Sequence, residues 1–494
     1  MIVPSIGYTL KSATGQLISQ KKRFDCEITM SRFDLLLVGA RVIDPLNKVD
    51  DFVDIGIADG KVKSIESGLE RRVADKIIEL DGKTAIPGVI DPHVHAGSTG
   101  YKMMTRAGVV TAIDFAASVE EICTNVQKNG SGMSVGTITS IRAYGNVAGT
   151  ELPRGLATDI TKRAIREGAL GIKIAGGHNP FTPEATRMII DVVNQERGYI
   201  GYHVGTTATG SDLNGLKEAV ELADSNRLHI AHVNSYLRGL IRDPVVESLE
   251  GLNALKGKRN LAHESYLAII NGTGGKCVDG LPDSHVTRNC LKMGKYTQDQ
   301  KGLEKAIEGG FAKVQVEMGG ESVLESGSEG VKYWKEANTD IGISFPVNVP
   351  QSTFLCATCR DDKGQFIVEG ISTDGGCIPR NVTVRSGLAL VRYSALTMEE
   401  FVTKVSTTPA KMFGMTSKGH LGIDADADIT VLDVEKGEPT MAIAKGQIIM
   451  INGVVTGQGG TVITTAEGHK AIKNSGLNCD IVDLEDSRFY RDSA

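Results

Sequence analysis

The chain has 494 residues, of which 41% are hydrophobic and 23% are charged, so it can bury a large core and is not disordered. Its formal net charge of −6, spread along the chain, gives no reason to expect nucleic acid or an anionic membrane as a partner. It has no apolar run near the roughly 18 residues of a membrane span, no recognisable signal peptide, and eight cysteines too scattered for a disulfide framework. We therefore expect reduced thiols and a cytoplasmic location.

The first predicted elements are short β-strands that follow an N-terminal extension at residues 1–32. Beyond it, runs such as 53–57 and 61–65 are short and β-like, and Asp59-Gly60 between them is a typical hairpin turn. We therefore predict that residues 33–84 form the first part of a small β domain.

From residue 85, apolar strands alternate with helical segments, which predicts a parallel sheet built from strand–helix units. The apolar run at 85–90 is the first predicted strand, and 213–223 is a predicted helix because its apolar residues recur at helical spacing. Eight strand-forming runs predict an α/β protein with a closed (β/α)8 TIM-type barrel over 85–405, whose active site lies where the strands end. The other seven strands are expected at 109–117, 135–142, 170–175, 200–204, 228–233, 261–270 and 367–371.

One interval within the barrel region, residues 272–365, is too long for a single connection between a strand and a helix. It contains Gly and Ser clusters together with a helical stretch at 303–312. We interpret it as an insertion near the barrel mouth.

Strand-like runs resume beyond the barrel, at 427–432 and in two short runs joined by the turn Asn452-Gly453. We predict that residues 406–460 pair with 33–84 to form one small β-sandwich domain beside the barrel. Residues 461–494 are predicted to be a C-terminal tail.

Two histidines, His93 and His95, end the first predicted barrel strand. Residues i and i+2 of a strand point the same way, so both can bind one metal ion. Further candidate ligands lie at or near the ends of later strands, and one is a lysine, which is costly inside an apolar strand unless its charge is removed or compensated. Each single histidine has an ordinary core or loop interpretation, but the six residues together predict a metal centre. The further candidates are Lys173, His203, His232 and Asp374.

In this pattern the chain resembles the amidohydrolase superfamily, and within it the hydantoinase-, dihydropyrimidinase- and N-acyl-D-amino-acid deacylase-like metal-dependent hydrolases. The superfamily has His-x-His after the first strand, Lys after the fourth, His after the fifth and sixth, and Asp after the eighth. Every part has a counterpart here. Residues 408–414 and 419–432 also resemble the superfamily's exit from the barrel and its return to the β domain.

The resemblance implies a binuclear metal centre. His93, His95 and Asp374 would hold the more buried ion, and His203 and His232 the other. Lys173, carboxylated by carbon dioxide, would bridge the two. Zinc suits these ligands, and manganese or another transition metal also fits. The ions would generate a bridging hydroxide, and Asp374 would act as general base and then general acid.

Six further residues are candidates for contacting the substrate, each with an ordinary structural interpretation beside the functional one. One follows Lys173 closely, three follow the sixth strand, one ends the seventh strand together with Glu264, and one lies beyond Asp374, where it could hold a carboxylate. They are His178, Asn234, Tyr236, Arg238, His263 and Arg380.

The leading functional prediction is hydrolysis of an amide C–N bond in a small molecule, preferentially a cyclic amide of the hydantoin, dihydropyrimidine or lactam type. An N-acyl-D-amino-acid deacylase is an alternative, because the chain length, the short interval between His203 and His232 and the long insertion resemble that group, although Lys173 departs from its pattern. An aminohydrolase is less favoured, because no helper Glu follows His203. A non-catalytic scaffold barrel would have lost metal ligands, and here all six positions are filled. The resemblance also implies a homo-oligomer, either a dimer or a tetramer.

Overall fold

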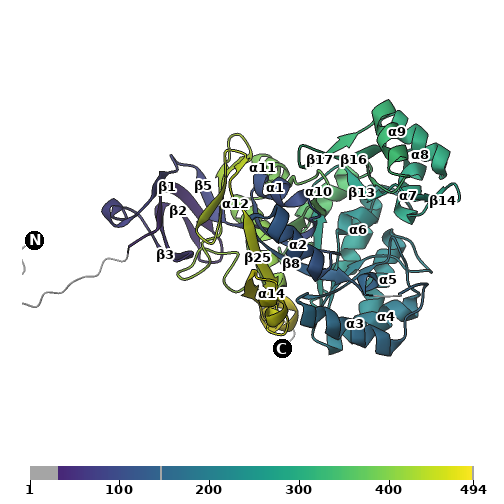
Figure 1. Cartoon of the computed structure of the whole chain (residues 1–494), viewed down its shortest axis with the longest axis horizontal. Helices are drawn as coiled ribbons and strands as arrows, with labels where there is room; N and C mark the ends of the chain where they lie inside the picture. The colour runs from purple at the N-terminus through teal and green to yellow at the C-terminus, as the bar shows by residue number, and fades with distance from the viewer. Residues whose placement is uncertain (1–31, 145–146, 492–494) are drawn as a thin grey trace, which may run out of the picture.

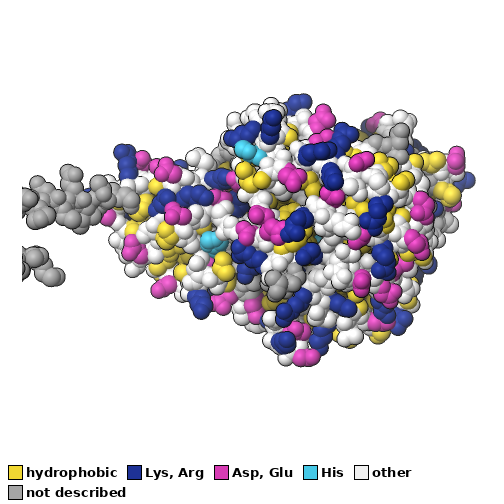
Figure 2. All heavy atoms as spheres, turned by 90° about the horizontal axis from the view of Figure 1, so that it is seen from below, with side chains coloured by type: hydrophobic (Ala, Val, Ile, Leu, Met, Phe, Trp, Pro, Cys, Tyr) yellow, Lys and Arg dark blue, Asp and Glu magenta, His cyan; other side chains and the backbone are white. Residues whose placement is uncertain are grey.

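The computed structural model describes residues 32–144 and 147–491, so the predicted extension at 1–32 lies outside the described residues except for Arg32. Figure 1 shows a small β domain at one end of the molecule, an α/β insertion at the other end and the barrel between them. On the face drawn in Figure 2, acidic and basic side chains are interspersed. Within the described ranges, every helix is too short or too polar to cross a bilayer.

The predicted parallel barrel is confirmed. Its strands are hydrogen-bonded in the order β20-β6-β7-β8-β9-β10-β11-β12-β19, and every pair along this path is parallel. Only Thr373 and Asp374 separate β19 from β20, so these two short strands form one interrupted stave that closes a ring of eight. The strands are β6 (Val89–His95), β7 (Val109–Asp114), β8 (Ser131–Ser140), β9 (Gly171–Ala175), β10 (Tyr199–His203), β11 (Leu228–Ile230), β12 (Leu261–Tyr266), β19 (Gly370–Ser372) and β20 (Gly375–Gly376).

Amphipathic helices connect these strands and pack their apolar sides against the barrel. The helix α5 spans Leu213–Ala223, as predicted, and it buries Leu213, Leu216 and Leu222. The other barrel helices are α1 (Gly100–Arg106), α2 (Val119–Asn129), α3 (Arg154–Glu167), α4 (Pro183–Gln195), α6 (Pro244–Leu255), α10 (Pro350–Thr358) and α11 (Thr383–Arg392), followed by α12 (Met398–Val402), a π-helical turn at Thr403–Thr407 and α13 (Thr408–Met412).

The predicted first strand at 85–90 is two strands in the structure. The strand β5 (Thr84–Pro87) belongs to the small domain, and the barrel begins at Val89. Gly88 lies at the junction, where a Cβ atom would lie 2.2 Å from Cγ2 of Val110, so the two domains approach too closely for a side chain.

The small β domain forms from both ends of the chain, as predicted. Its strands make one nine-stranded sheet, in which β21 pairs antiparallel with β5 and thereby joins the C-terminal part to the N-terminal part. The strands are β1 (Leu35–Asp44), β2 (Val49–Ala58), β3 (Lys61–Glu66), β4 (Ile77–Glu79), β5, β21 (Ile429–Asp433), β22 (Glu438–Ala444), β23 (Gln447–Ile451) and β24 (Val454–Val455).

The insertion is a compact unit with its own apolar core, which includes Trp334 and Phe345. Its main sheet has the antiparallel order β13-β18-β16-β17. It ends near residue 349 rather than at the predicted residue 365, because α10 packs on the barrel helix α6. Its elements are β13 (Asn271–Gly274), β14 (Cys277–Val278), β15 (Leu281–Pro282), α7 (His285–Met293), α8 (Gln300–Glu308), β16 (Lys313–Met318), β17 (Glu321–Glu325), α9 (Gly327–Glu336) and β18 (Gly342–Phe345).

The segment predicted as a C-terminal tail is structured as far as Arg491. Its first strand, β25 (Gly459–Thr464), runs parallel to the first half of β8, and β26 (Asn478–Ile481) pairs with β25. This segment therefore extends the barrel sheet at the end opposite the predicted site. It also contains the short helices α14 (His469–Asn474) and α15 (Arg488–Arg491).

Candidate functional site

The six predicted metal ligands all lie at the carboxyl-end rim of the barrel. His93 and His95 end β6, Lys173 lies in β9 and His203 ends β10. His232 lies two residues beyond β11, and Asp374 lies in the gap between β19 and β20. Parallel strands of a closed barrel end at the same rim, which is why residues far apart in sequence meet here.

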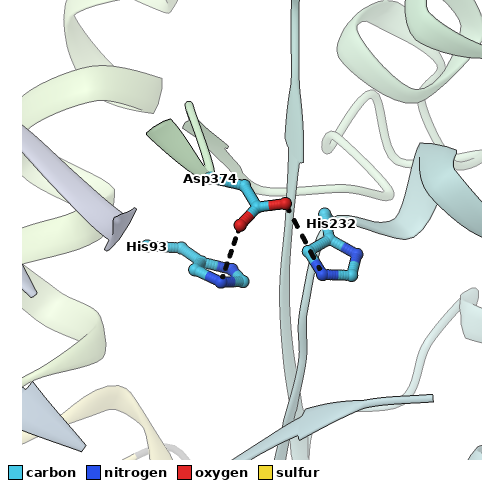
Figure 3. A group of neighbouring side chains, drawn as sticks. All are labelled: His93, His232 and Asp374. Atoms are coloured by element: carbon cyan, nitrogen blue, oxygen red, sulfur yellow. Dashed lines mark ion pairs between the residues drawn. The ribbon is translucent and has the colours of Figure 1, made fainter. Parts of the chain in front are cut away.

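The carboxylate of Asp374 lies at the centre of the group. Its Oδ1 atom is 3.1 Å from Nε2 of His95 and 3.4 Å from Nε2 of His93, and its Oδ2 atom is 3.9 Å from Nε2 of His232. Figure 3 shows the imidazoles of His93 and His232 on opposite sides of this carboxylate. One ligand atom from each of these three buried residues lies within 4.8 Å of the other two, a spacing that could hold a metal ion.

His203 and Lys173 lie beside this group of three. The ring centroid of His203 is 4.6 Å from that of His232, and Nζ of Lys173 is 5.4 Å from the ring centroid of Phe115. Lys173 is only 4% exposed, and burial lowers the pKa of its amine. The buried amine is therefore poised to lose its charge.

The protonation states of the cluster suit cation binding. Burial lowers the pKa of His93 to about 4 and the pKa values of His203 and His232 well below the usual value, so these imidazoles are neutral. Burial opposes ionisation of Asp374, but Arg380 and the nearby imidazoles outweigh it and hold the pKa of the carboxyl well below its usual value. Neutral imidazoles and an ionised carboxylate are the forms that bind divalent metal ions.

An orphaned nitrogen supports the same interpretation. Nδ1 of His93 donates to Oε1 of Glu264 over 2.8 Å, which leaves the lone pair of Nε2 facing Asp374. That Nε2 atom is buried, and it has no hydrogen-bond partner among residues 32–144 and 147–491. Similarly, Nδ1 of His232 bonds Oγ of Ser235 over 2.7 Å and leaves Nε2 toward Asp374. Metal-binding histidines show this arrangement, so the residues present fit a divalent cation.

Two of these residues adopt left-handed backbone conformations that are uncommon outside glycine. The φ angle is +33° at His232 and +46° at Asp374. The amide of His232 donates to Oε1 of Glu264 over 2.7 Å, and the amide of Asp374 donates to the carbonyl of His93 over 2.9 Å. These bonds hold both side chains at the barrel mouth, and such strain is typical of functional sites.

The chain is similar to known proteins in sequence and in fold. No protein-family model matches the chain. It is 24% identical over 439 residues to the dihydroorotase of Elusimicrobium minutum, a match that covers 81% of this chain and 88% of the relative. Its fold resembles N-acyl-D-glutamate deacylase from Bordetella bronchiseptica, complexed with zinc and a phosphonate inhibitor, with a TM-score of 0.64 and 14% identity over 87% of this chain and 99% of that one. A D-hydantoinase gives a TM-score of 0.57 and 14% identity over 87% and 98%.

The sequence match spans most of both chains, and the shared barrel carries the superfamily's pattern of strand-end residues. These matches bear out the resemblance of the chain to the amidohydrolase superfamily. The similar proteins are hydrolases that act on carbon–nitrogen bonds other than peptide bonds.

A pocket opens onto the cluster, and the insertion covers it. Barrel residues form the floor, the loop after β11 forms one wall, and α7 of the insertion forms the roof. The lining residues that matter below are His203, His232 and Asp374 from the barrel rim, Arg238 and Leu240 from the loop, and Val286, Asn289, Cys290 and Met293 from α7.

Three of the predicted substrate contacts lie around this pocket. Arg238 lines it, and its guanidinium donates to the hydroxyl of Tyr266 over 2.7 Å. The ring centroid of His178 is 4.9 Å from that of His203. Arg380 is buried, and it donates to the carbonyl of Asp374 over 2.6 Å and pairs with Oδ2 of the same residue at 2.5 Å. The carboxylate that Arg380 holds in this structure therefore belongs to Asp374.

The structure does not bring the other three predicted contacts into the pocket. The side-chain amide of Asn234 bonds both the main-chain N–H and the carbonyl of Tyr266, so it fastens the loop to β12. The hydroxyl of Tyr236 accepts from the amide of Val204 behind the ligands. His263 points to the opposite side of β12 from Glu264, because neighbouring residues of a strand alternate.

Two carboxylates that support the site are harder to find in the sequence. Of the pair at the end of β12, Glu264 is the residue that reaches the cluster, where it contacts His93. Asp91 accepts from the amide of His93 over 3.2 Å and from the hydroxyl of Thr373 over 2.6 Å, which links the first and last staves. The signal for Asp91 was its position two residues before His93, on the same side of β6.

Proposed function

We propose that this amidohydrolase hydrolyses the amide C–N bond of a small cyclic amide, of the hydantoin, dihydropyrimidine or lactam type, with two divalent metal ions. The observation that carries the proposal is Lys173, a buried amine that interacts electrostatically with His93, His203, His232 and Asp374. Reaction with carbon dioxide would turn this amine into an anionic carbamate with two oxygen ligands. Zinc is the proposed metal, because imidazole and carboxylate donors suit it.

In the proposed site, His93, His95 and Asp374 would hold one ion, His203 and His232 would hold the other, and Lys173, as a carbamate, would supply oxygen ligands to both. The two metal ions, when bound, would lower the pKa of a water molecule and polarise the substrate carbonyl. Asp374 takes the proton of the attacking water and passes it to the departing nitrogen. Arg380 holds the carboxylate of Asp374 ionised and oriented until that proton arrives.

The pocket supports an anionic substrate with an apolar part. Arg238 presents a guanidinium at the pocket, whereas Leu240, Val286 and Met293 present apolar surface. The similarity to a dihydroorotase supports a cyclic amide. A linear N-acyl amino acid also combines a carboxylate with an apolar group, so it is the second candidate, and we place His178 and Arg238 in substrate binding for either one.

We also propose that the enzyme is a cytoplasmic homo-oligomer, either a dimer or a tetramer. Supporting this, the outer faces of α6 and α10 expose Val246, Leu249 and Phe354 at 48%, 53% and 49%. Such apolar clusters typically mark association surfaces. Light scattering of the purified protein should give twice or four times the chain mass, and a monomer at micromolar concentration would contradict this.

A hydrolysis screen tests the substrate proposal. The protein, purified with zinc or manganese and bicarbonate, is assayed on hydantoins, dihydropyrimidines and lactams beside N-acyl-D- and N-acyl-L-amino acids. We expect ring opening of at least one cyclic amide class, accompanied by two metal ions per chain. Turnover confined to N-acyl amino acids would replace the cyclic proposal with the deacylase, and absence of bound metal would overturn both.

A further inference from the structure

Glu264 lies in β12, beneath the metal-ligand cluster, and its side chain is completely buried. It accepts three hydrogen bonds, each from a different strand end. Oε1 accepts from Nδ1 of His93 over 2.8 Å and from the amide of His232 over 2.7 Å, and Oε2 accepts from the hydroxyl of Ser372. One carboxylate thus connects the ends of β6, β11 and β19.

The three connected strand ends carry the three residues that form the close group. Glu264 bonds His93 through its ring and His232 through its backbone, and Ser372 lies two residues before Asp374. These are the residues whose ligand atoms lie within 4.8 Å of one another. The bond to His93 also fixes the ring tautomer that leaves Nε2 free, and the bond to His232 supports its left-handed backbone.

We propose that Glu264 is a positioning residue that sets the metal affinity of the site, by orienting His93 and holding His232 and Asp374 around one point. This inference rests on the proposed metal-dependent function, but it does not depend on the identity of the substrate. Glu264 acts through the ligands, since it lies below them and outside the residues that line the pocket.

A second buried glutamate provides a matched control. Glu247, at the start of α6, is also completely buried, and it accepts from the amides of Gly239, Ile241 and Arg242. Its partners are the backbone of one loop, and none of them is a predicted metal ligand. Removing its charge should therefore affect the stability of that loop and leave the affinity for the ion unchanged.

Glu264→Gln separates charge from shape. The carbonyl oxygen of glutamine can take the place of Oε1 and accept both N–H groups, while its amide donates to the hydroxyl of Ser372. The variant should therefore fold, but a neutral acceptor makes His93 a weaker ligand. We expect zinc affinity, measured by competition with a chromophoric chelator, to fall about 10- to 100-fold. The absorption spectrum of the cobalt-substituted protein should also change, which a purely structural role would not cause.

Glu247→Gln, by contrast, should keep the zinc affinity and the cobalt spectrum of the parent protein. Wild-type affinity and spectrum in Glu264→Gln would overturn the inference, as would an equal loss of affinity in Glu247→Gln. If Glu264→Gln does not fold, Ser372→Ala, which removes one bond to the same carboxylate, decides in the same way: weaker zinc binding supports the inference and unchanged binding overturns it. A parent protein that binds zinc without cleaving amides would refute the proposed substrate alone, whereas one that binds no divalent ion would refute both.

Discussion

Two buried lysines show how differently this chain treats the same side chain. Lys418 in the small domain and Lys173 at the barrel mouth are each only 4% exposed. Lys418 lies 2.7 Å from Oδ2 of Asp428, 2.9 Å from Oδ2 of Asp426 and 3.4 Å from Oδ2 of Asp480, and the attraction of these carboxylates raises its pKa despite burial. Lys173 has an aromatic ring beside it, and burial lowers its pKa.

The charge of Lys418 has a structural role, whereas Lys173 is the lysine proposed to react. Three carboxylates surround Lys418, so its positive charge is compensated within the protein. Because one of them, Asp480, lies in β26, these ion pairs also join β26 to the small domain. No described carboxylate forms an ion pair or hydrogen bond with Lys173, so its charge must be removed or compensated by something else. The proposed carbamate would do this, and it would also supply anionic oxygen ligands for the two proposed metal ions.

The largest expected effect comes from Lys173→Ala. Without the bridging group, we expect bound metal to fall from two ions to one or none per chain and hydrolysis to fall below detection. Metal analysis and the cyclic-amide assay measure the two effects. Short carboxylic acids should restore part of the activity, because they can occupy the place of the carbamate. Full activity without any added acid would remove Lys173 from the site.

The Asp374→Asn substitution separates two roles proposed for Asp374, metal binding and proton transfer. Asparagine keeps an oxygen ligand but cannot carry a proton, so we expect metal to be retained while kcat falls by about 10²- to 10⁴-fold. Metal content and steady-state kinetics on the same preparation test this. Near-normal kcat would exclude Asp374 as the proton carrier.

The Lys418→Met substitution removes the buried ion pairs of the structural lysine. The variant leaves Asp428 buried without its cation and leaves Asp426 with Lys61 alone, and we expect a loss of about 3–5 kcal/mol in the free energy of unfolding. Urea unfolding measures the loss. The folded fraction should still bind two metal ions, and a loss of metal would show that the two lysines are not independent.

The smallest expected effect is a pH dependence of the metal-free protein. The pKa values of His93 and His178 are about 4 in the folded chain, below the usual value of 6.5, so the unfolded chain binds more protons between these values. Stability should therefore fall by a few kcal/mol as the pH is lowered from 7 toward 4. The pKa of Asp426 is held below its usual value, chiefly by Lys418, so this carboxylate keeps its charge over this range.

Urea unfolding at pH 7 and pH 5 measures this dependence. In His178→Asn the change between the two pH values should be smaller, because one of the depressed groups is gone. Equal stability of the parent protein at both values would show that the imidazoles are not held neutral by burial.

The sequence predicted those parts of the molecule whose signal is local. Strand–helix alternation is a repeated local pattern, and it was enough to predict the barrel and the helix α5. The pattern failed where packing between segments decides the structure. Nothing local divides residues 85–90 between two domains, because the break at Gly88 arises from the approach of Val110. Similarly, α10 buries only small residues, Ser352, Cys356 and Ala357, and therefore lacks a strong amphipathic pattern.

The candidate site shows the same division. Strand ends could be located in the sequence, so the six predicted ligands come together at one rim. Their supporting contacts could not be located, because a register shift of one residue decides whether His263 or Glu264 faces the cluster. Arg380 was expected near a carboxylate, but the sequence could not indicate that this carboxylate is that of Asp374, since only the loop after β20 brings them together.

The interrupted eighth stave links metal binding to the closure of the barrel during folding. Asp374 lies at the seam of the ring, and the bond between Asp91 and Thr373 spans 282 positions of the chain. A newly synthesised chain that has not yet docked its last strand therefore lacks the central carboxylate and has only part of the cation cradle. Metal binding to the full set of ligands would therefore require a closed barrel, and it would stabilise the closed form by mass action.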